Sequence, residues 1–341
     1  MLLGPYTPPD YLALSDEIRR WRESRRARPR TRPTPLRPRV MALRMFGFTI
    51  TAFTVLGAFV LGFEDSWAQP LVAVAVAYAL ELGLETIDAW ARERRPRYRG
   101  GGLKGLVDYL LPAHITALAI AMLLYPGDRL MPIVFAVSVA IGSKFALRVA
   151  VDGRSRHFLN PSNFGISVAL LSFPSIGLMA PYHFTENISG VLDWALPLGI
   201  LMAGTMLNIR LTGKAPLIVG WLGGFVAQAL VRALFFGTPL AGPLLPLTGV
   251  AMILFTNYMI TDPATTPVKR ARQFAFGLAT AAVYGTLVSV HVVFGMFFAL
   301  TIVAGTRGLY LGWLAVREHA YDRAPVAAAV AEPAPSNVLA R

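Results

Sequence analysis

The amino-acid sequence predicts an all-α, polytopic membrane protein with about ten transmembrane helices. Of its 341 residues, 55% are hydrophobic and only 15% are charged, which is far from the balance of soluble domains. Apolar stretches of about 20 residues, long enough to cross the ~30 Å hydrocarbon layer of a bilayer, recur along the chain with mostly short loops between them. Ten spans divide into two five-helix halves of opposite orientation, a pattern compatible with a 5+5 inverted repeat.

The first expected element is a basic, Pro/Arg-rich cytoplasmic arm at residues 1–39. Eleven arginines lie between Arg19 and Arg44, and a segment of this composition does not bury enough apolar surface to fold. Arginines beside a first span are typical of segments that stay in the cytoplasm and contact anionic lipid. We therefore expect the lipid bilayer, and no nucleic acid, to be the partner of this charge.

A transmembrane domain is expected at 40–317, followed by a disordered C-terminal tail at 318–341. The ten spans are predicted at approximately 42–62, 70–90, 105–125, 130–151, 161–180, 191–209, 214–235, 243–260, 273–290 and 293–315. The stretch 274–316 is almost unbroken, and we interpret it as two helices with a tight turn near Ser289–Gly295. Gly220 and Gly224 have a small-residue spacing that predicts close helix packing.

The charges between the spans predict the orientation of the chain. Alternate loops carry the arginines and lysines, namely Arg92, Arg94, Arg95, Arg97, Arg99 and Lys104; Arg154 and Arg156; Arg210 and Lys214; Lys269, Arg270 and Arg272; Arg317 and Arg323. The other loops have little positive charge. Because positively charged loops remain inside, we expect a multi-pass protein of the cell inner (plasma) membrane with both termini cytoplasmic.

Two polar, proline-bearing stretches interrupt this apolar background, and the first is "HFLNPSNFGI" at 157–166. Asn160 before Pro161 suits a helix start, because the asparagine side chain caps free N–H groups and proline takes the first helical position. A capped helix start is also an acceptor for an anionic or carbonyl-bearing ligand. Both interpretations remain open from the sequence.

The second stretch is "MITDPATTPVK" at 259–269. Pro263 and Pro267 end a regular helix, and the side chains of Thr261, Asp262, Thr265 and Thr266 supply oxygens for freed backbone groups or for a ligand. Both stretches are placed at the cytoplasmic boundary, so we expect them to converge on one pocket.

Together the two motifs resemble the integral-membrane family that includes the B subunit of the sodium-translocating NADH:quinone reductase and the D subunit of the Rnf complex (NqrB/RnfD). The resemblance extends to the ten-span plan over roughly residues 40–315 and to "SKFALRVAVDGRSRHFLNPSNFGI". Within this family, the chain length and the "MITDPATTP" form are most similar to stand-alone UnbU-type proteins of enediyne biosynthetic clusters.

The resemblance implies a fold similar to urea and ammonium transporters, a bound flavin, and electron transfer to a redox partner protein or quinone. Redox relatives attach FMN to a threonine in a Ser/Asp-Gly-Ala-Thr motif, which the outer segment "SFPSIGLMAPYHFTENISGVLDW" lacks. No covalent FMN is therefore predicted, and the expected cofactor is a noncovalent flavin, riboflavin or FMN, near the cytoplasmic face. The candidate binding residues are Lys144, Arg148, Asn160, Pro161, Asn163, Asn257, Thr261, Asp262, Pro263, Thr265 and Thr266.

Other ionisable groups fall within the predicted spans. Glu81, Glu85 and Asp88 share one helical face, where they form either an ion or proton pathway or ion pairs with Lys144, Arg148 or the arginines at 92–99. Lys144 and Arg148 lie one turn apart, a spacing that suits either an anion or contact with lipid head groups. His114 is a candidate proton relay, although single histidines are more often structural.

The composition and motifs also exclude several classes of chemistry. The chain has no cysteine, so disulfides and cysteine-ligated clusters are excluded. No histidines are spaced as metal ligands, and no metal is predicted. The expected function is a membrane-embedded flavin-binding electron-transfer protein, as a component of a membrane oxidoreductase. The alternatives are a small-solute transporter or channel without a redox cofactor and a membrane scaffold for biosynthetic enzymes.

Overall fold

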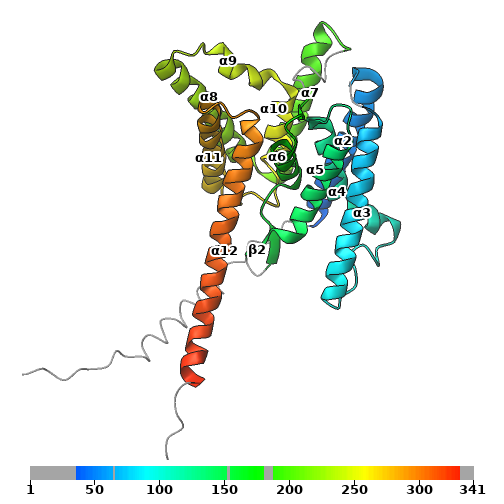
Figure 1. Cartoon of the computed structure of the whole chain (residues 1–341), viewed down its shortest axis with the longest axis vertical. Helices are drawn as coiled ribbons and strands as arrows, with labels where there is room; N and C mark the ends of the chain where they lie inside the picture. The colour runs from blue at the N-terminus through cyan, green and yellow to red at the C-terminus, as the bar shows by residue number, and fades with distance from the viewer. Residues whose placement is uncertain (1–35, 64–65, 152–153, 180–186, 331–341) are drawn as a thin grey trace, which may run out of the picture. The chain divides into compact units, whose positions relative to one another are not determined.

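The structure is a computed structural model that describes residues 36–63, 66–151, 154–179 and 187–330. The chain divides into two units, Met1–Met41 and Ala42–Arg341. The first described helix begins at Leu36, so its first residues belong to the first unit, and the rest of that helix and all later elements belong to the second. The arm expected at 1–39 lies almost entirely outside the described residues. Most of the described chain is helical (Figure 1), which confirms the predicted fold class.

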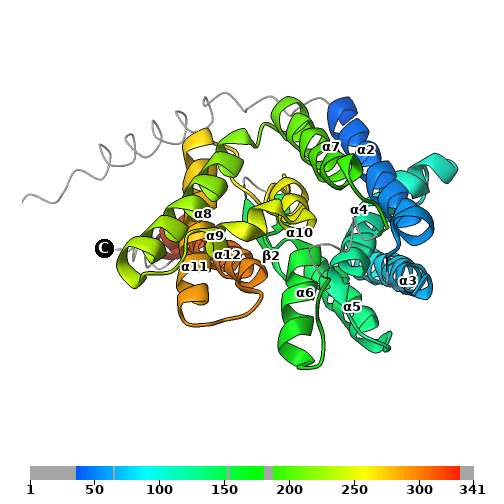
Figure 2. The ribbon, with the colours of Figure 1, turned by 90° about the horizontal axis from the view of Figure 1, so that it is seen from above.

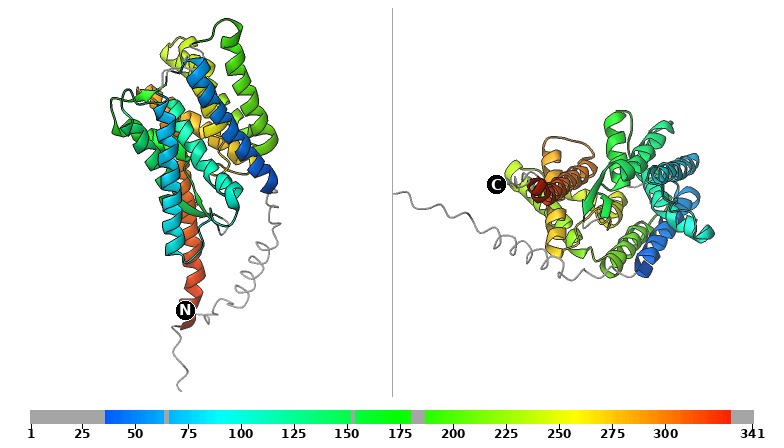
Figure 3. Two further views of the ribbon diagram at one scale, coloured as in Figure 1. Left: turned by 90° about the vertical axis from the view of Figure 1, so that its right-hand side faces the viewer. Right: turned by 90° about the horizontal axis from the view of Figure 1, so that it is seen from below.

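The first part of the helical unit contains four helices. They are α2 (Leu36–Leu56), which continues into the π-helical turn η1 (Gly57–Leu61), α3 (Ala68–Ala91), α4 (Gly102–Leu123) and α5 (Met131–Ala146). Helices α3 and α4 pack side by side, and α5 packs against both of them. The cyan and blue-green ribbons of α3 and α4 can be followed together in Figure 3.

A short helix follows in the core of the unit. Helix α6 (Pro161–Ser172) contacts α4, α5 and α12, and Figure 2 shows it beside α5. Two small antiparallel sheets flank it: β2 (Arg148–Val151) pairs with β3 (Arg154–His157), and β1 (Leu124–Tyr125) pairs with β4 (Gly177–Leu178). The β2–β3 hairpin therefore precedes the start of α6, and β4 follows its end and pairs back with β1.

The remaining elements complete the helical unit. They are α7 (Val191–Leu207) with the π-helical turn η2 (Asn208–Thr212), α8 (Ala215–Phe236), α9 (Ala241–Leu244), η3 (Leu245–Thr248), α10 (Val250–Leu254), the π-helical turn η4 (Phe255–Met259), α11 (Arg270–Ser289) and α12 (Gly295–Val330). Helix α12 continues through 318–330, where a disordered tail was predicted. Alanines at 324 and 327–329 favour the helix, and residues 331–341 lie outside the described part of the chain.

Helices α8 and α11 are closely packed through glycines. A Cβ atom at Gly220 would lie 2.3 Å from the carbonyl oxygen of Phe274, and one at Gly277 would lie 2.3 Å from that of Leu217. The two backbones therefore touch where side chains are missing, as small residues allow in membrane helices. Gly224 meets Ala281 in the same interface, so the packing role predicted for Gly220 and Gly224 is confirmed.

Several helices have the properties of membrane spans. Six are long and apolar enough: Val40–Leu61, Ala68–Ala91, Gly102–Leu123, Ala195–Thr212, Ala215–Phe236 and Gly295–Arg317. A seventh is obtained if the pair Ala241–Leu247 and Ala251–Met259, bent by 62°, counts as one span. The chain is thus an all-α, multi-pass membrane protein with six or seven candidate spans, rather than the predicted ten.

The difference from ten spans has a physical cause in three helices. At ~1.5 Å per residue, the 16 residues of α5 and the 12 of α6 extend only about 24 and 18 Å, which is less than a ~30 Å hydrocarbon layer. Helix α11 has 20 residues, but its first turn carries Arg270, Arg272 and Gln273, which lowers its hydropathy. Each predicted segment contains a helix, yet this count does not support the 5+5 repeat.

Candidate functional site

Asn160 joins the two polar motifs. As the N-cap of α6, its Oδ1 accepts from the Asn163 backbone N–H at 3.0 Å and from the Ser162 hydroxyl at 2.9 Å. Its Nδ2 donates to the Met259 carbonyl at 3.1 Å, across 99 residues of sequence. The predicted cap is confirmed, and Asn160 and the 259–267 loop come together as expected. We call this region, Asn160 with the loop Met259–Pro267, the motif junction.

The loop of the motif junction is closed by its own side chains. Asp262 accepts from the Ala264 N–H at 2.9 Å and from the Thr265 hydroxyl at 3.1 Å. Thr266 donates to the Asp262 carbonyl at 2.6 Å, and Thr261 donates to the Asn257 carbonyl at 2.6 Å. These contacts form the helix-terminating turn predicted from the prolines. The same hydrogen bonds engage the side-chain oxygens that the sequence predicts as possible ligand groups.

Two cations, the buried Lys214 and the half-buried Arg307, hold the loop from neighbouring elements. Lys214, just before α8 and only 3% exposed, donates to the Pro267 carbonyl at 2.8 Å. Arg307 of α12 donates to the Thr265 carbonyl at 2.9 Å. Neither was among the predicted site residues. Arg307 lies inside the last apolar run, and an ionisable residue within a span is a functional candidate by default, so this signal was available in the sequence.

The environment of the junction is unfavourable to positive charge, although positive groups gather there. Burial lowers the pKa of Lys214 to about 8, the nearby Arg307 also lowers it, and the Asp262 carboxylate raises it. Burial likewise lowers the pKa of His157, and the charge of Asp262 acts in the opposite direction by raising that pKa. Asp262 forms no ion pair with any described residue. The Asp262 carboxylate thus acts electrostatically on both Lys214 and His157.

Lys144 and Arg148 do not form the pair of cations on one helical face that their spacing predicts. Lys144 forms an ion pair with Glu81 at 2.6 Å, with 11% and 7% of the two side chains exposed. Helix α5 ends at Ala146, so Arg148 lies in β2 and does not share a helical face with Lys144. Val149 and Val151 favour the extended strand that replaces the expected helix end.

The acidic face of α3 is occupied by cations. Glu85, with a fully buried side chain, pairs with Arg94 at 2.6 Å and Arg97 at 3.2 Å. Asp88 pairs with Arg92 at 2.8 Å and also with Arg94. With the Lys144–Glu81 pair, all three carboxylates adopt the ion-paired alternative. An ion or proton pathway through Glu81, Glu85 and Asp88 remains a prediction.

His114 lies between three helices with both ring nitrogens bonded. Its Nε2 is 2.8 Å from the Thr51 hydroxyl and its Nδ1 is 2.9 Å from the Tyr78 hydroxyl. Because the Thr51 hydroxyl donates to the Gly47 carbonyl at 2.7 Å, it accepts from Nε2–H. Tyr78 then donates to Nδ1, which describes a neutral imidazole. This arrangement matches the structural alternative, and the relay role stays a prediction.

Asn163 and Asn257 both lie in contacts between helices. Asn163 donates to the Phe297 carbonyl and to the Thr301 hydroxyl, each at 2.9 Å. The Asn257 carbonyl accepts from Asn208 at 2.7 Å, which joins the π-helical turns η2 and η4. Pro161 begins α6 directly after Asn160, and Pro263 follows Asp262 in the junction loop. Of the two predicted cations, Lys144 is held by Glu81 and Arg148 lies in β2.

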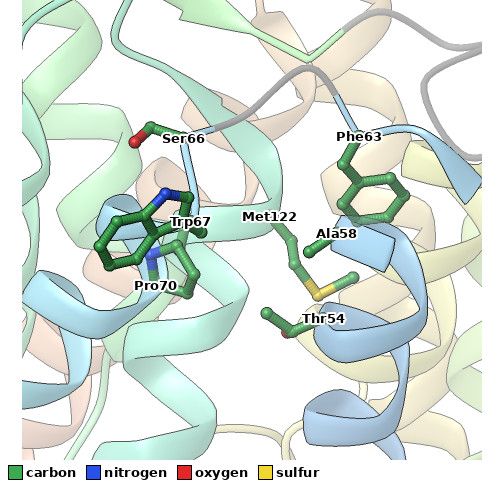
Figure 4. Close-up of a pocket in the computed structure, with 8 residues that line it drawn as sticks. Thr54, Ala58, Phe63, Ser66, Trp67, Pro70 and Met122 are labelled. Carbon is green, nitrogen blue, oxygen red and sulfur yellow. The ribbon is translucent and has the colours of Figure 1, made fainter. Parts of the chain in front are cut away.

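Two further features complete the description. A cavity of about 20 Å³ lies among α2, α3 and α4 (Figure 4), lined mainly by apolar residues such as Ala58, Pro70 and Met122; it has room for about one water molecule. Within the described ranges, no group of three or more His, Cys, Asp or Glu side chains is arranged to hold a metal ion. The part of the outer segment at 180–186, examined for a covalent FMN motif, lies outside the described residues.

The fold and the junction together describe a multi-pass membrane protein in which basic residues gather where helices begin and end. Comparison of the chain with protein-family models and with curated proteins finds no match.

Proposed function

We propose that the protein is a membrane-embedded electron-transfer protein that holds a flavin noncovalently at the motif junction, near the cytoplasmic face. The proposal includes membership of the NqrB/RnfD-like family, an inner-membrane location with cytoplasmic termini, and a redox partner protein or quinone. A role in natural-product (enediyne) biosynthesis belongs to the same proposal. Its support comes from the resemblance of the two motifs and from the charges that surround them.

The observation that carries the proposal is the unbalanced positive charge at the junction. Within the described chain, Lys214 and Arg307 donate to backbone carbonyls, at 2.8 and 2.9 Å, and form no ion pair. Asp262 is the carboxylate whose negative charge acts on Lys214. Buried cations are normally paired, because desolvation of an unpaired charge costs several kcal/mol, on the order of 3–5 when one partner is missing. A reduced, anionic flavin would supply the missing negative charge.

The residues present fit such a ligand in their chemistry. When bound, a flavin supplies the redox step. Lys214 and Arg307 would hold its anionic form and raise its reduction potential, while Asn160 and the closed loop would keep the site rigid through the bond to Met259. The apolar helices around the junction would exclude water from it.

The test is the visible absorption of the protein purified in mild detergent. Flavin bands that acid precipitation releases into the supernatant would support noncovalent binding, whereas colour that remains on the polypeptide would contradict it. Lys214→Met should lower flavin occupancy severalfold, because the charge next to the ligand is removed. Lys269→Met is the matched control, since Lys269 is exposed at the start of α11, and it should leave occupancy unchanged.

A second candidate function is transport of a small solute. It is favoured by two interrupted helices, the short buried α6 and the span bent by 62° between α9 and α10, because broken helices in the membrane core are typical of transporters. A colourless protein that binds or moves an anionic solute in proteoliposomes would replace the flavin proposal with this one.

A further inference from the structure

The β2–β3 hairpin brings two basic residues together beside the motif junction. In the antiparallel register, Arg148 is directly opposite His157, and directly opposite residues project from the same face of a sheet with Cβ atoms about 5 Å apart. Strand β2 packs against α12 and β3 against α5, and the label of β2 in Figure 1 marks this position between the two helices. The hairpin therefore presents this pair at the inner end of the helices around the junction.

Arg148 has an unmet hydrogen-bonding requirement. Its Nε is buried and has no acceptor among the described residues. A guanidinium group has five N–H donors in a planar fork, and an unpaired buried donor of a charged group is costly. The site is therefore short of an acceptor, and the best geometric match to a guanidinium fork is a carboxylate or a phosphate.

The nearby carboxylates are already engaged. Glu81 is bonded to Lys144 at 2.6 Å, and both oxygens of Asp262 accept from its own loop, from Ala264 and Thr265. Both acids act electrostatically on His157, as do the cations Lys144 and Arg148. No described carboxylate forms an ion pair with Arg148. No described residue therefore supplies the acceptor that Arg148 Nε lacks.

We propose that Arg148 and His157 bind the phosphate group of a phosphorylated ligand, which, resting on the proposed function, makes the flavin a phosphomonoester such as FMN rather than riboflavin. Arg148 donates from Nε and a terminal nitrogen to two phosphate oxygens, and a ring N–H of His157 donates to a third. The unphosphorylated flavin lacks these contacts. The same chemistry would accept the headgroup phosphate of a lipid such as phosphatidic acid.

The experiment is calorimetric titration of the full chain in phosphatidylcholine nanodiscs with FMN, riboflavin and inorganic phosphate. Wild-type protein should bind FMN at least about tenfold more tightly than riboflavin, the effect expected for charge-assisted hydrogen bonds. Arg148→Gln should remove this difference by weakening FMN alone. Arg156→Gln is the matched control, because Arg156 is an exposed arginine of the same hairpin, and it should keep the difference.

A second variant protects the test against simple misfolding. Arg148→Lys keeps the charge and loses the fork, so it should retain riboflavin affinity and recover only part of the preference for FMN. Equal affinities of the wild-type protein for FMN and riboflavin would overturn the phosphate site, and so would an equal loss of both ligands in Arg148→Gln.

The two proposals fail in different ways. If neither flavin binds, the proposed function fails, and the inorganic phosphate titration decides the phosphate site: binding that Arg148→Gln abolishes supports it, and no binding overturns it. Nanodiscs that contain phosphatidic acid identify the source of the phosphate. Loss of FMN binding there, restored in plain phosphatidylcholine, assigns the site to a lipid phosphate.

Discussion

The charged end of α3 and the motif junction are both rich in charge, but they balance it differently. On α3, Glu81, Glu85 and Asp88 are each paired with lysine or arginine, at 2.6 Å for the Glu81 and Glu85 pairs and at 2.8 Å between Asp88 and Arg92. At the junction, Lys214 and Arg307 meet backbone carbonyls instead. A region whose charges cancel is explained by stability alone, whereas the surplus positive charge at the junction is what the proposed anionic ligand would balance.

The largest expected effect comes from breaking the paired region. Glu85→Gln should lower the free energy of unfolding by about 3 kcal/mol, because it removes a buried carboxylate from between two arginines; the partial exposure of Arg94 and Arg97 keeps the cost from being larger. The measurement is thermal unfolding in detergent. Ligand occupancy per folded molecule should not change, and a selective loss of ligand would contradict the comparison.

The next effect concerns the bond that closes the junction. Asn160→Ala removes the cap of α6 and the bond to Met259, so we expect a loss of about 2 kcal/mol in unfolding free energy. Ser162→Ala is the control, because it removes only a hydroxyl that donates to Asn160; its cost should be about 1 kcal/mol or less. Equal costs for the two variants would show that the bridge to the second motif contributes nothing.

A smaller effect sharpens the electrostatic side of the comparison. Lys214 has a pKa of about 8, so it carries its charge at pH 7 and loses it as the pH rises through 8. The affinity for an anionic ligand should therefore fall as the pH is raised from 7 to 9, by about tenfold for the loss of one charge–charge contact. Binding titrations across this range measure it. Lys214→Arg should bind independently of pH over the same interval.

The smallest effect tests a third polar cluster. Tyr78→Phe removes the hydroxyl that donates to His114, and the expected cost is about 1 kcal/mol of unfolding free energy. Flavin occupancy should be unaffected, because the Tyr78 hydroxyl bonds to His114 and not to a described residue of the motif junction. An altered pH dependence of electron transfer in this variant would instead support the relay role predicted for His114.

Much of the fold and part of the site could be predicted from local sequence. Asn160 and Pro161 predict the start of α6 because cap chemistry involves only neighbouring residues, and Pro263 and Pro267 predict the turn for the same reason. Gly220 and Gly224 predicted close packing. The number of spans was wrong because apolar composition does not distinguish a spanning helix from the short α6, which is buried against other helices.

The sequence by itself determined that this is a helical membrane protein, where its polar breaks lie and which turns close them, because hydropathy, proline and capping act over a few residues. Tertiary structure decided the partners of the charges. Lys144 meets Glu81 across 63 residues and Arg307 meets Thr265 across 42, while Arg148 is left with a buried Nε and no acceptor. Which charge is paired depends on how distant segments pack, and no local pattern contains that information.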